Sequence, residues 1–287
     1  MPNHAIAAEE LLYRYGDLVA VNRISFDVAE QEILGFLGPN GAGKTTTFKM
    51  LTGQLKPKGG TARLLDMDIT SDISRIKANI GVCFETTNLY EQMSAEENLN
   101  LFAKLFDIRD FDADALLARV DLDGRGRDKV ETFSKGMKQR LMVARSIINQ
   151  PKILFLDEPT SGLDPASAEK IRTVILEERE RGASVFLTTH DMMEADKLSD
   201  RVAFMNQGEI SALDTPLNLK RQYGRRALKV RIAGGNGDLE DREIPLDTAE
   251  TTEAVQQLFA NEQIITVHSE EATLEDIFIK LTGRGLV

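Results

Sequence analysis

The sequence predicts an α/β fold with a mostly parallel sheet, followed by a small α+β domain. Short apolar runs at residues 33–37, 153–156 and 185–188 have the length and composition of strands covered on both faces. Segments with helical spacing of apolar residues separate these runs, as in proteins with a parallel sheet. Residues 24–28 instead alternate apolar and polar side chains, which is typical of a half-buried strand near a sheet edge.

A mainly helical stretch interrupts the strand pattern between about residues 86 and 150. Ser94 and Glu97 have the spacing of a capping box, in which each side chain bonds the other residue's backbone N–H group. Apolar residues then recur at helical spacing from Leu99 to Phe106. We therefore expect a helical subdomain within the α/β domain.

A second domain is expected to begin after a change of composition near residue 222. The sequence then divides into a first domain over residues 1–222 and a second over residues 227–287. At about 60 residues the second domain is near the lower limit for independent folding. Its expected elements are strands at 228–232 and up to 246 around a glycine-rich turn at 234–237, a helix at 253–259, a strand at 264–267 and a helix from 274.

Composition and charge exclude several classes of protein. The chain has 46 acidic and 35 basic residues, and the net charge of -11 argues against nucleic-acid binding, which needs clustered Lys and Arg. A single cysteine, Cys83, excludes an internal disulfide and fits a reducing compartment. We expect Cys83 to be a small buried hydrophobic residue. No signal peptide is evident and no apolar stretch approaches the roughly 18 residues of a membrane helix, so a role at a membrane requires a separate spanning partner.

A phosphate-binding loop is the strongest functional motif. Residues 38–46 match G-x-x-x-x-G-K-[ST], follow a strand, and open a helix whose apolar residues Phe48, Leu51 and Leu55 are expected on one face. Glycines let successive N–H groups turn inward around an anion, and the helix N-terminus adds partial positive charge. The alternative is a glycine-rich turn that binds nothing, which the Lys-Thr pair makes the weaker reading.

Within this loop the residue types match ATP and Mg²⁺. Lys44 can reach the terminal phosphates and is expected to take part in catalysis, and the Thr45 hydroxyl can ligate Mg²⁺. The residues expected to contact the nucleotide are Gly38, Pro39, Asn40, Gly41, Ala42, Gly43, Lys44, Thr45 and Thr46.

Three further polar residues follow the buried strands. Asp157 is placed to hold Mg²⁺ through water, and Glu158 can polarise an attacking water molecule. A strand running into a polar loop would explain one acidic residue better than two. His190 follows another strand, at the sheet edge where ligands bind in such folds, although a lone histidine is more often structural. We expect Glu158 and His190 to act in catalysis.

The order of the phosphate loop, the acidic pair and the histidine resembles that of the ATP-binding cassette (ABC) ATPases, over roughly residues 6–220. The resemblance implies a P-loop NTPase fold of the ABC type, with antiparallel edge strands and a helical subdomain. Residues 161–165 resemble the family's D-loop, which implies a nucleotide contact for Asp164. Tyr15 matches the aromatic residue that stacks on adenine; a surface aromatic residue is the alternative.

Residues 133–140 occupy the position of the family's signature motif, and Ser134 and Gly136 are retained. A helix with apolar residues on one face follows, so its N-terminus can face an anion. In the family this segment binds the γ-phosphate held by another subunit, which implies a two-fold dimer with a second copy or a homologous ATPase. Lys135 replaces a glycine and either adds positive charge beside the nucleotide or points into solvent. An ordinary capped helix is the alternative reading.

Glu85 is a second departure, because the family's Q-loop normally has glutamine here. A carboxylate is a harder oxygen donor than an amide, so Glu85 can ligate Mg²⁺. It also adds negative charge near the triphosphate and Asp157. We therefore expect altered turnover of ATP.

The resemblance implies an ATP-hydrolysing subunit of an ABC transporter at the cytoplasmic face of a membrane. ATP-driven dimer closure would move a separate transmembrane permease subunit, contacted through Glu85 and residues 86–110. The ending at residues 274–284 looks like that of ATPase subunits from drug- and ABC-2-type exporters, which favours export. The second domain could have a regulatory role, stabilise the dimer, or be a purely structural extension of the ATPase domain.

Two other functions stay open. A soluble ABC ATPase acting on ribosomes or DNA is disfavoured by the single cassette and the negative charge. An ATP-dependent clamp with little turnover is disfavoured because Glu158 and His190 are both present.

Overall fold

The computed structural model describes residues 4–224, 226–233, 239–246 and 251–283. The chain divides into two compact units between Leu213 and Asp214. The boundary expected near residue 222 falls later in the chain than this division, because helix α8 (Pro216–Tyr223) belongs to the second unit. There it packs against α10 (Leu274–Thr282), a partner more than fifty residues away in the sequence.

The first unit is built on a six-stranded sheet whose strands, in spatial order, are β10 (Glu209–Asp214), β9 (Arg201–Asn206), β3 (Ile33–Leu37), β8 (Ser184–Thr189), β7 (Ile153–Asp157) and β6 (Ile80–Cys83). The pairs formed by β3 with β8 and β9, and by β7 with β8 and β6, are parallel. Every residue of β3, β7 and β8 is buried, which confirms the three apolar runs as strands covered on both faces. The C-terminal ends of β3, β8 and β7 therefore meet at one edge, where ligands bind in such sheets.

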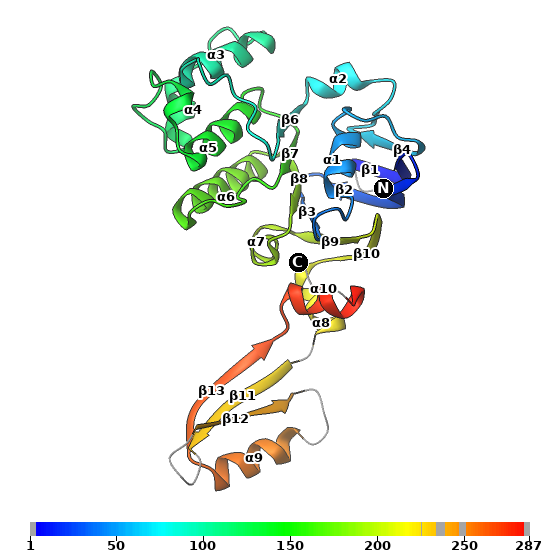
Figure 1. Ribbon diagram of the computed structural model, residues 1–287, viewed down its shortest axis with the longest axis vertical. Helices are drawn as coiled ribbons and strands as arrows, with labels where there is room; N and C mark the ends of the chain where they lie inside the picture. Colours follow the sequence, from blue (N-terminus) through cyan, green and yellow to red (C-terminus); the bar gives the residue numbers. More distant parts are fainter. Residues whose placement is uncertain (1–3, 225, 234–238, 247–250, 284–287) are drawn as a thin grey trace. The chain divides into compact units, whose positions relative to one another are not determined.

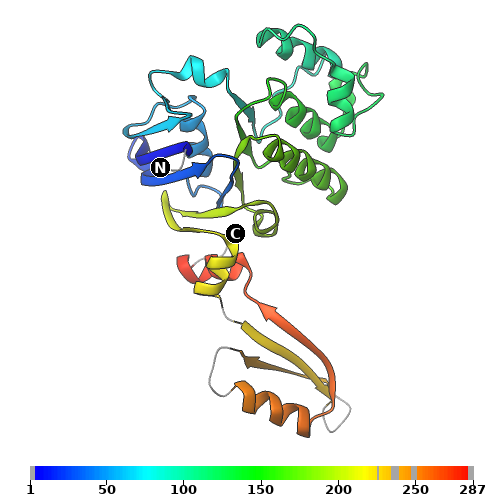
Figure 2. The ribbon, with the colours of Figure 1, turned by 180° about the vertical axis from the view of Figure 1, so that it is seen from behind.

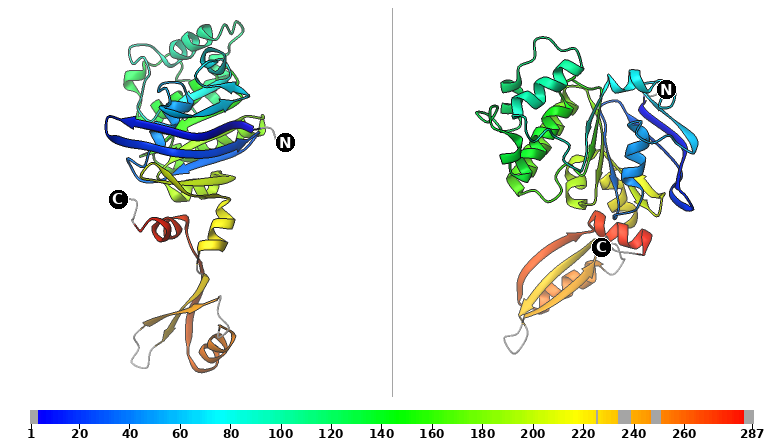
Figure 3. Two further views of the ribbon diagram at one scale, coloured as in Figure 1. Left: turned by 90° about the vertical axis from the view of Figure 1, so that its right-hand side faces the viewer. Right: turned by 45° about the horizontal axis from the view of Figure 1, so that its top comes forward.

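A second, antiparallel sheet has the order β2-β1-β4-β5 and covers one face of the first, together with helix α1 (Figures 1 and 3). The strand expected at residues 24–28 is part of β2. Five phenylalanines from the two sheets and α1 pack between them, with neighbouring ring centroids 4.8–6.0 Å apart. The elements are β1 (His4–Tyr15), β2 (Leu18–Ala29), α1 (Lys44–Leu51), β4 (Gly59–Leu64), β5 (Met67–Asp68) and α2 (Ile73–Lys77).

Helix α1 ends earlier than its apolar pattern predicts. It stops at Leu51, so the expectation that Leu55 shares its apolar face is wrong. Gly53 adopts a left-handed conformation, with φ of 71°, and its N–H group bonds the carbonyl of Met50 at 3.1 Å. A glycine in this conformation closes a helix, and the apolar pattern beyond it is then part of a loop.

The opposite face of the six-stranded sheet is covered by helices α5 and α6, and α3 and α4 pack on the outer side of α5 (Figures 1 and 2). The capping box is confirmed, since the Glu97 N–H group donates to Ser94 Oγ at 3.1 Å and the Ser94 N–H group donates to Glu97 Oε2 at 2.7 Å. Cys83 is fully buried, as expected, in the hydrophobic core between the sheet and these helices, and burial raises the pKa of its thiol to about 12. The elements are α3 (Ala95–Leu105), α4 (Ala113–Arg119), the 3₁₀-helix η1 (Val130–Thr132), α5 (Lys135–Ser146), α6 (Pro165–Glu180) and, after β8, α7 (Met192–Leu198).

The second unit contains a three-stranded antiparallel sheet in which β11 (Arg226–Ala233) lies between β12 (Leu239–Pro245) and β13 (Ile264–Glu271). Helix α9 (Thr251–Asn261) covers one face of this sheet and closes a small core on it (Figure 2). The strands and helices expected here are thus present, as an α+β arrangement. The glycine-rich turn expected at 234–237 lies outside the described residues.

Candidate nucleotide-binding and hydrolysis site

The loop after β3 wraps around the ammonium group of Lys44. Lys44 is buried, and its Nζ donates to the carbonyl oxygens of Gly38 at 2.6 Å and Pro39 at 3.3 Å. The loop is held tightly, because a Cβ atom at Gly38 would lie 2.1 Å from the backbone oxygen of Met205. Gly43 has φ of 111° and caps the N-terminus of α1. The sequence thus builds a glycine-rich loop that holds its own lysine at the N-terminus of a helix, which is the arrangement of a phosphate site.

Asp157 lies beside this loop, at the end of β7. Its Oδ1 accepts hydrogen bonds from Thr45 Oγ1 at 3.4 Å and from the Thr188 hydroxyl. Burial raises the pKa of the Asp157 carboxyl, and the charges of Glu85 and Glu158 raise it further, whereas the bonds from Thr188 and Thr45 lower it.

The Thr45–Asp157 pair has the chemistry of a Mg²⁺ site. Both donors are hard oxygens, and Mg²⁺ is usually held by one or two carboxylates together with phosphate oxygens and waters. Among the residues that the structure describes, no three His, Cys, Asp or Glu side chains gather into a metal-binding group. The donors present therefore fit an ion that is completed by a nucleotide rather than a closed protein cage.

Glu158 and His190 form a close pair. His190 Nδ1 lies 2.8 Å from Glu158 Oε2, and Glu158 Oε1 lies 3.5 Å from Lys44 Nζ. Glu158 is buried, whereas His190 is about half exposed. The strand order brings these residues together, because they follow β7, β8 and β3, which are neighbours in the sheet. A carboxylate held between a histidine and a lysine is well placed to orient water beside a phosphate.

Comparison with known proteins agrees with this geometry. The family model described as ABC transporter matches residues 21–161. A fluoroquinolones export ATP-binding protein of Mycobacterium tuberculosis is 44% identical over 98% of this chain and 94% of its own length. A linearmycin resistance ATP-binding protein of Bacillus subtilis is 31% identical over 98% of this chain and 99% of its own length. A solved structure of an ATP-binding subunit of an ABC transporter superimposes with a TM-score of 0.70 at 27% identity, covering 76% of this chain and 93% of that one.

The chain belongs to the ABC transporter family. It is an ATP-binding subunit of the ABC type, and the hydrolysis of ATP by such subunits is coupled to transport. The fold is correspondingly that of an ABC ATPase domain, with its parallel core sheet, antiparallel sheet and helical side.

The ABC signature segment and the D-loop lie next to each other. Ser134 caps α5, accepting from the Met137 N–H group at 3.3 Å, and Asp164 caps α6, accepting from the Ser167 N–H group at 2.9 Å. A Cβ atom at Gly136 would lie 2.8 Å from Ser167 Oγ, so the small residue allows this approach.

Two of these residues have contacts that the sequence did not reveal. The bonds from Ser167 lower the pKa of Asp164, whose side chain thus has a structural role within its own helix. Lys135 extends over the D-loop, because a Cβ atom at Gly162 would lie 2.5 Å from Lys135 Nζ.

Tyr15 and Glu85 are both exposed. Tyr15 ends β1 and packs edge-on against Tyr13, with ring centroids 4.9 Å apart, which leaves much of its ring open to stacking. Glu85 lies in the loop after β6, and its charge acts on Asp157.

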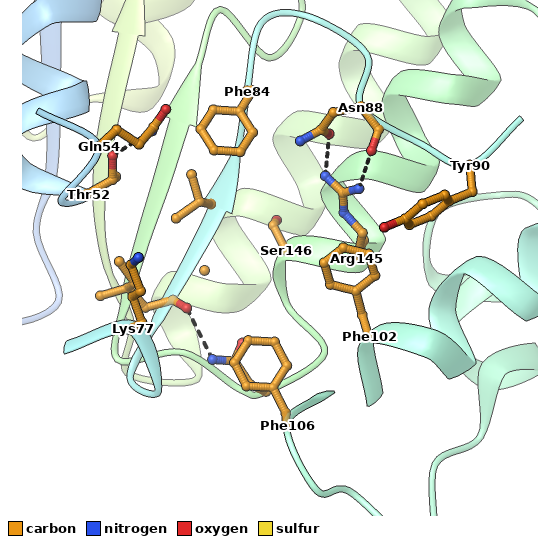
Figure 4. A pocket seen from close by; sticks show the side chains of 14 residues that line it. Thr52, Gln54, Lys77, Phe84, Asn88, Tyr90, Phe102, Phe106, Arg145 and Ser146 are labelled. Atoms are coloured by element: carbon orange, nitrogen blue, oxygen red, sulfur yellow. Dashed lines mark hydrogen bonds between the residues drawn. The ribbon is translucent and has the colours of Figure 1, made fainter. Parts of the chain in front are cut away.

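A groove of about 460 Å³ lies beside this Q-loop, next to the helical side of the ABC domain (Figure 4). Its wall includes the rings of Phe84, Tyr90, Phe102 and Phe106. Arg145 donates to the backbone oxygen of Asn88 at 2.8 Å and to Asn88 Oδ1, and its guanidinium lies 4.5 Å from the centre of the Phe102 ring. Arg145 therefore joins the signature helix α5 to the loop that follows Glu85.

Two residues of this site region were missed in the sequence. Arg145 is buried, and it lies one turn after Leu141 on the apolar face of α5. Glu194 is buried on α7 and bonds Thr160. In both cases a charged residue occupies a position that helical spacing assigns to the core, and that conflict is the signal that could have found them.

Proposed function

We propose that the chain is the ATP-hydrolysing subunit of a small-molecule exporter, acting with a separate membrane permease. The observation that carries hydrolysis is the Glu158–His190 pair, 2.8 Å apart and adjoining Lys44. Export is supported by the two full-length relatives, which are named for fluoroquinolone export and linearmycin resistance.

In the proposed mechanism, ATP binds with its phosphates in the loop around Lys44 and its adenine against Tyr15. Thr45 and Asp157 hold Mg²⁺, with Glu85 as a further donor; the ion supplies positive charge that stabilises the phosphates. Ser134, Lys135, Gly136 and Asp164 of a second subunit contact the same nucleotide. These contacts exist only in the closed dimer, so ATP binding favours closure.

Hydrolysis then reopens the dimer. Glu158 orients a water molecule toward the γ-phosphate, and His190 fixes the Glu158 carboxylate through the bond to Oε2. Lys44 offsets charge on the terminal phosphates. Loss of the γ-phosphate removes the contacts that hold the two subunits together.

We further propose that the permease docks at the groove beside residues 86–110, on the cytoplasmic face of the membrane. Aromatic side chains and a buried arginine are the residue types enriched where proteins bind tightly. Arg145 connects this groove to the signature helix, which offers a path from docking to the nucleotide. In the described part of the chain no helix has the length and apolar character to cross a bilayer.

Affinity purification from detergent-solubilised membranes tests this proposal. A stoichiometric polytopic membrane protein should co-purify with the tagged chain. Tyr90→Ala removes an exposed ring of the groove and should lower its recovery roughly tenfold, as for an interface hot spot. Phe259→Ala is the matched control, because Phe259 is 57% exposed, close to the 53% of Tyr90, and lies on α9.

The same purification separates the competing functions. If ribosomal proteins co-purify instead of a membrane protein, the exporter proposal is contradicted. If the membrane protein is recovered equally with Tyr90→Ala, the proposed docking site is contradicted. The ATPase activity would stand in either case.

A further inference from the structure

A buried carboxylate, Glu194, lies where the segments that carry Glu158 and His190 meet. It occupies the first turn of α7, and its N–H group donates to Asp191 Oδ1 at 3.1 Å. Only 3% of the residue is exposed. Its place is thus fixed by the start of the helix that follows His190.

One oxygen of Glu194 joins two loops. Glu194 Oε2 accepts from the hydroxyl of Thr160 and from Thr189 Oγ1, the latter at 3.5 Å. Thr160 is two residues after Glu158 and leads into the D-loop, and Thr189 directly precedes His190. The Asp191 N–H group also donates to Thr189 Oγ1, at 3.0 Å, which fixes that hydroxyl.

The second oxygen has a different environment. Glu194 Oε1 is buried and has no hydrogen-bond partner among the residues the structure describes. Glu194 also lines a pocket of about 340 Å³, together with Glu158 and His190. Burial raises the pKa of the Glu194 carboxyl, and the nearby charge of Asp191 adds to this, while the Thr160 bond and the charge of Arg172 lower it.

Folding alone does not account for this arrangement. A buried carboxylate that is bonded only by hydroxyl groups, with one oxygen unpaired, costs stability that an apolar side chain would avoid. Such groups are retained where they serve a site. Glu158 itself needs external restraint, because its backbone is left-handed, with φ of 50°.

We propose that Glu194 is a positioning residue for ATP hydrolysis. By holding Thr160 and Thr189 on one oxygen, it sets the distance between the segment after Glu158 and the segment before His190. It thereby keeps the Glu158–His190 pair aligned and ties the pair to the start of the D-loop. This inference rests on the proposed roles of Glu158 and His190.

Steady-state ATPase kinetics on the full chain test the proposal. Glu194→Ala should lower kcat roughly tenfold or more, the scale on which small misplacements of catalytic groups act. KM for ATP should stay within about twofold, because the phosphate loop is untouched. Glu194→Gln keeps an accepting oxygen and should retain kcat within about threefold of the native value. This rescue and the split between kcat and KM distinguish positioning from a general loss of structure.

A double-mutant cycle addresses the link to Thr160. Thr160→Val removes the donor and should lower kcat in the same direction as Glu194→Ala. The double variant should be no slower than Glu194→Ala alone, since both changes remove one connection. Losses that multiply would overturn the proposal, because the two residues would then act independently.

Two controls make the outcome decisive. Ser199→Ala removes another buried oxygen that has no hydrogen-bond partner in the described part of the chain, at the C-terminal end of the same helix, and it should leave kcat unchanged. If Glu158→Gln abolishes turnover but Glu194→Ala and Thr160→Val do not lower it, the inference about Glu194 fails while the proposed site stands. If Glu158→Gln turns over ATP at the native rate, the proposed site itself fails.

Discussion

Glu158 combines an uncommon backbone with a fixed side chain. Its φ of 50° places a residue other than glycine in the left-handed region, at a cost of about 1–3 kcal/mol. Its N–H group bonds the carbonyl of Thr188 at 3.0 Å, so the neighbouring strand β8 holds it in this conformation. Its carboxylate lies between His190 Nδ1 and Lys44 Nζ. The site is thus organised for chemistry at the expense of local stability.

The raised pKa of Glu194 predicts that the stability of the fold depends on pH. Burial raises its pKa in the folded chain, so between the ordinary value and the raised value the folded state binds more protons than the unfolded state. Its contribution to stability is therefore full at low pH and is lost as pH rises through the raised pKa. Glu194→Gln lacks this loss, so its Tm relative to the native chain should rise by a few degrees between about pH 4 and pH 8. Melting curves across this range measure the difference, and a constant offset would contradict the assignment.

At the scale of elements, the sequence predicted the buried strands and the order of their motifs, but not the sheet order. Apolar runs such as residues 153–156 report burial on both faces, whereas the pairing of β3 with β8 depends on contacts distant in the sequence. The pairing of β7 with β8, which sets Asp157 opposite Thr188, is likewise long-range, and it places His190 beside Glu158. The predicted end of α1 was wrong because the apolar periodicity of the sequence continues past Gly53, whose backbone closes the helix.

The loop after β6 carries a prediction of its own. The Glu85 charge acts on Asp157 and would oppose negative charge at the phosphates, so Glu85→Gln should change ATP turnover. Removing about 1 kcal/mol of repulsion would raise kcat roughly fivefold. Glu30→Gln is the matched control, since Glu30 is exposed and precedes β3, at the end of that strand opposite the phosphate loop. Coinciding rates for native and Glu85→Gln enzyme would refute a role for this charge.

At the scale of the whole molecule, each unit has its own core. Two clusters of buried side chains line the two faces of the six-stranded sheet, and a smaller one closes the second unit under α9. The elements of the second unit that follow α8 were predictable from alternation and helical spacing. Its boundary was not, because α8 is assigned to it by packing on α10, which no local pattern encodes.

In the candidate site, too, some residues could be predicted from the sequence and others could not. Phosphate-loop, acidic and histidine positions were visible as motifs, since their chemistry requires fixed residue types at fixed spacings. Arg145 and Glu194 were not, because their partners Asn88 and Thr160 come from other parts of the chain.

The most direct test is phosphate release by purified native chain and Glu158→Gln, with ATP affinity measured on both. Glu158 is proposed to orient the attacking water, whereas Lys44 and the phosphate loop bind ATP without it. We predict that Glu158→Gln lowers kcat about a hundredfold or more and binds ATP with a Kd within about threefold of the native value. Native turnover by Glu158→Gln would contradict the account, because hydrolysis would then not depend on the carboxylate that the fold holds beside His190.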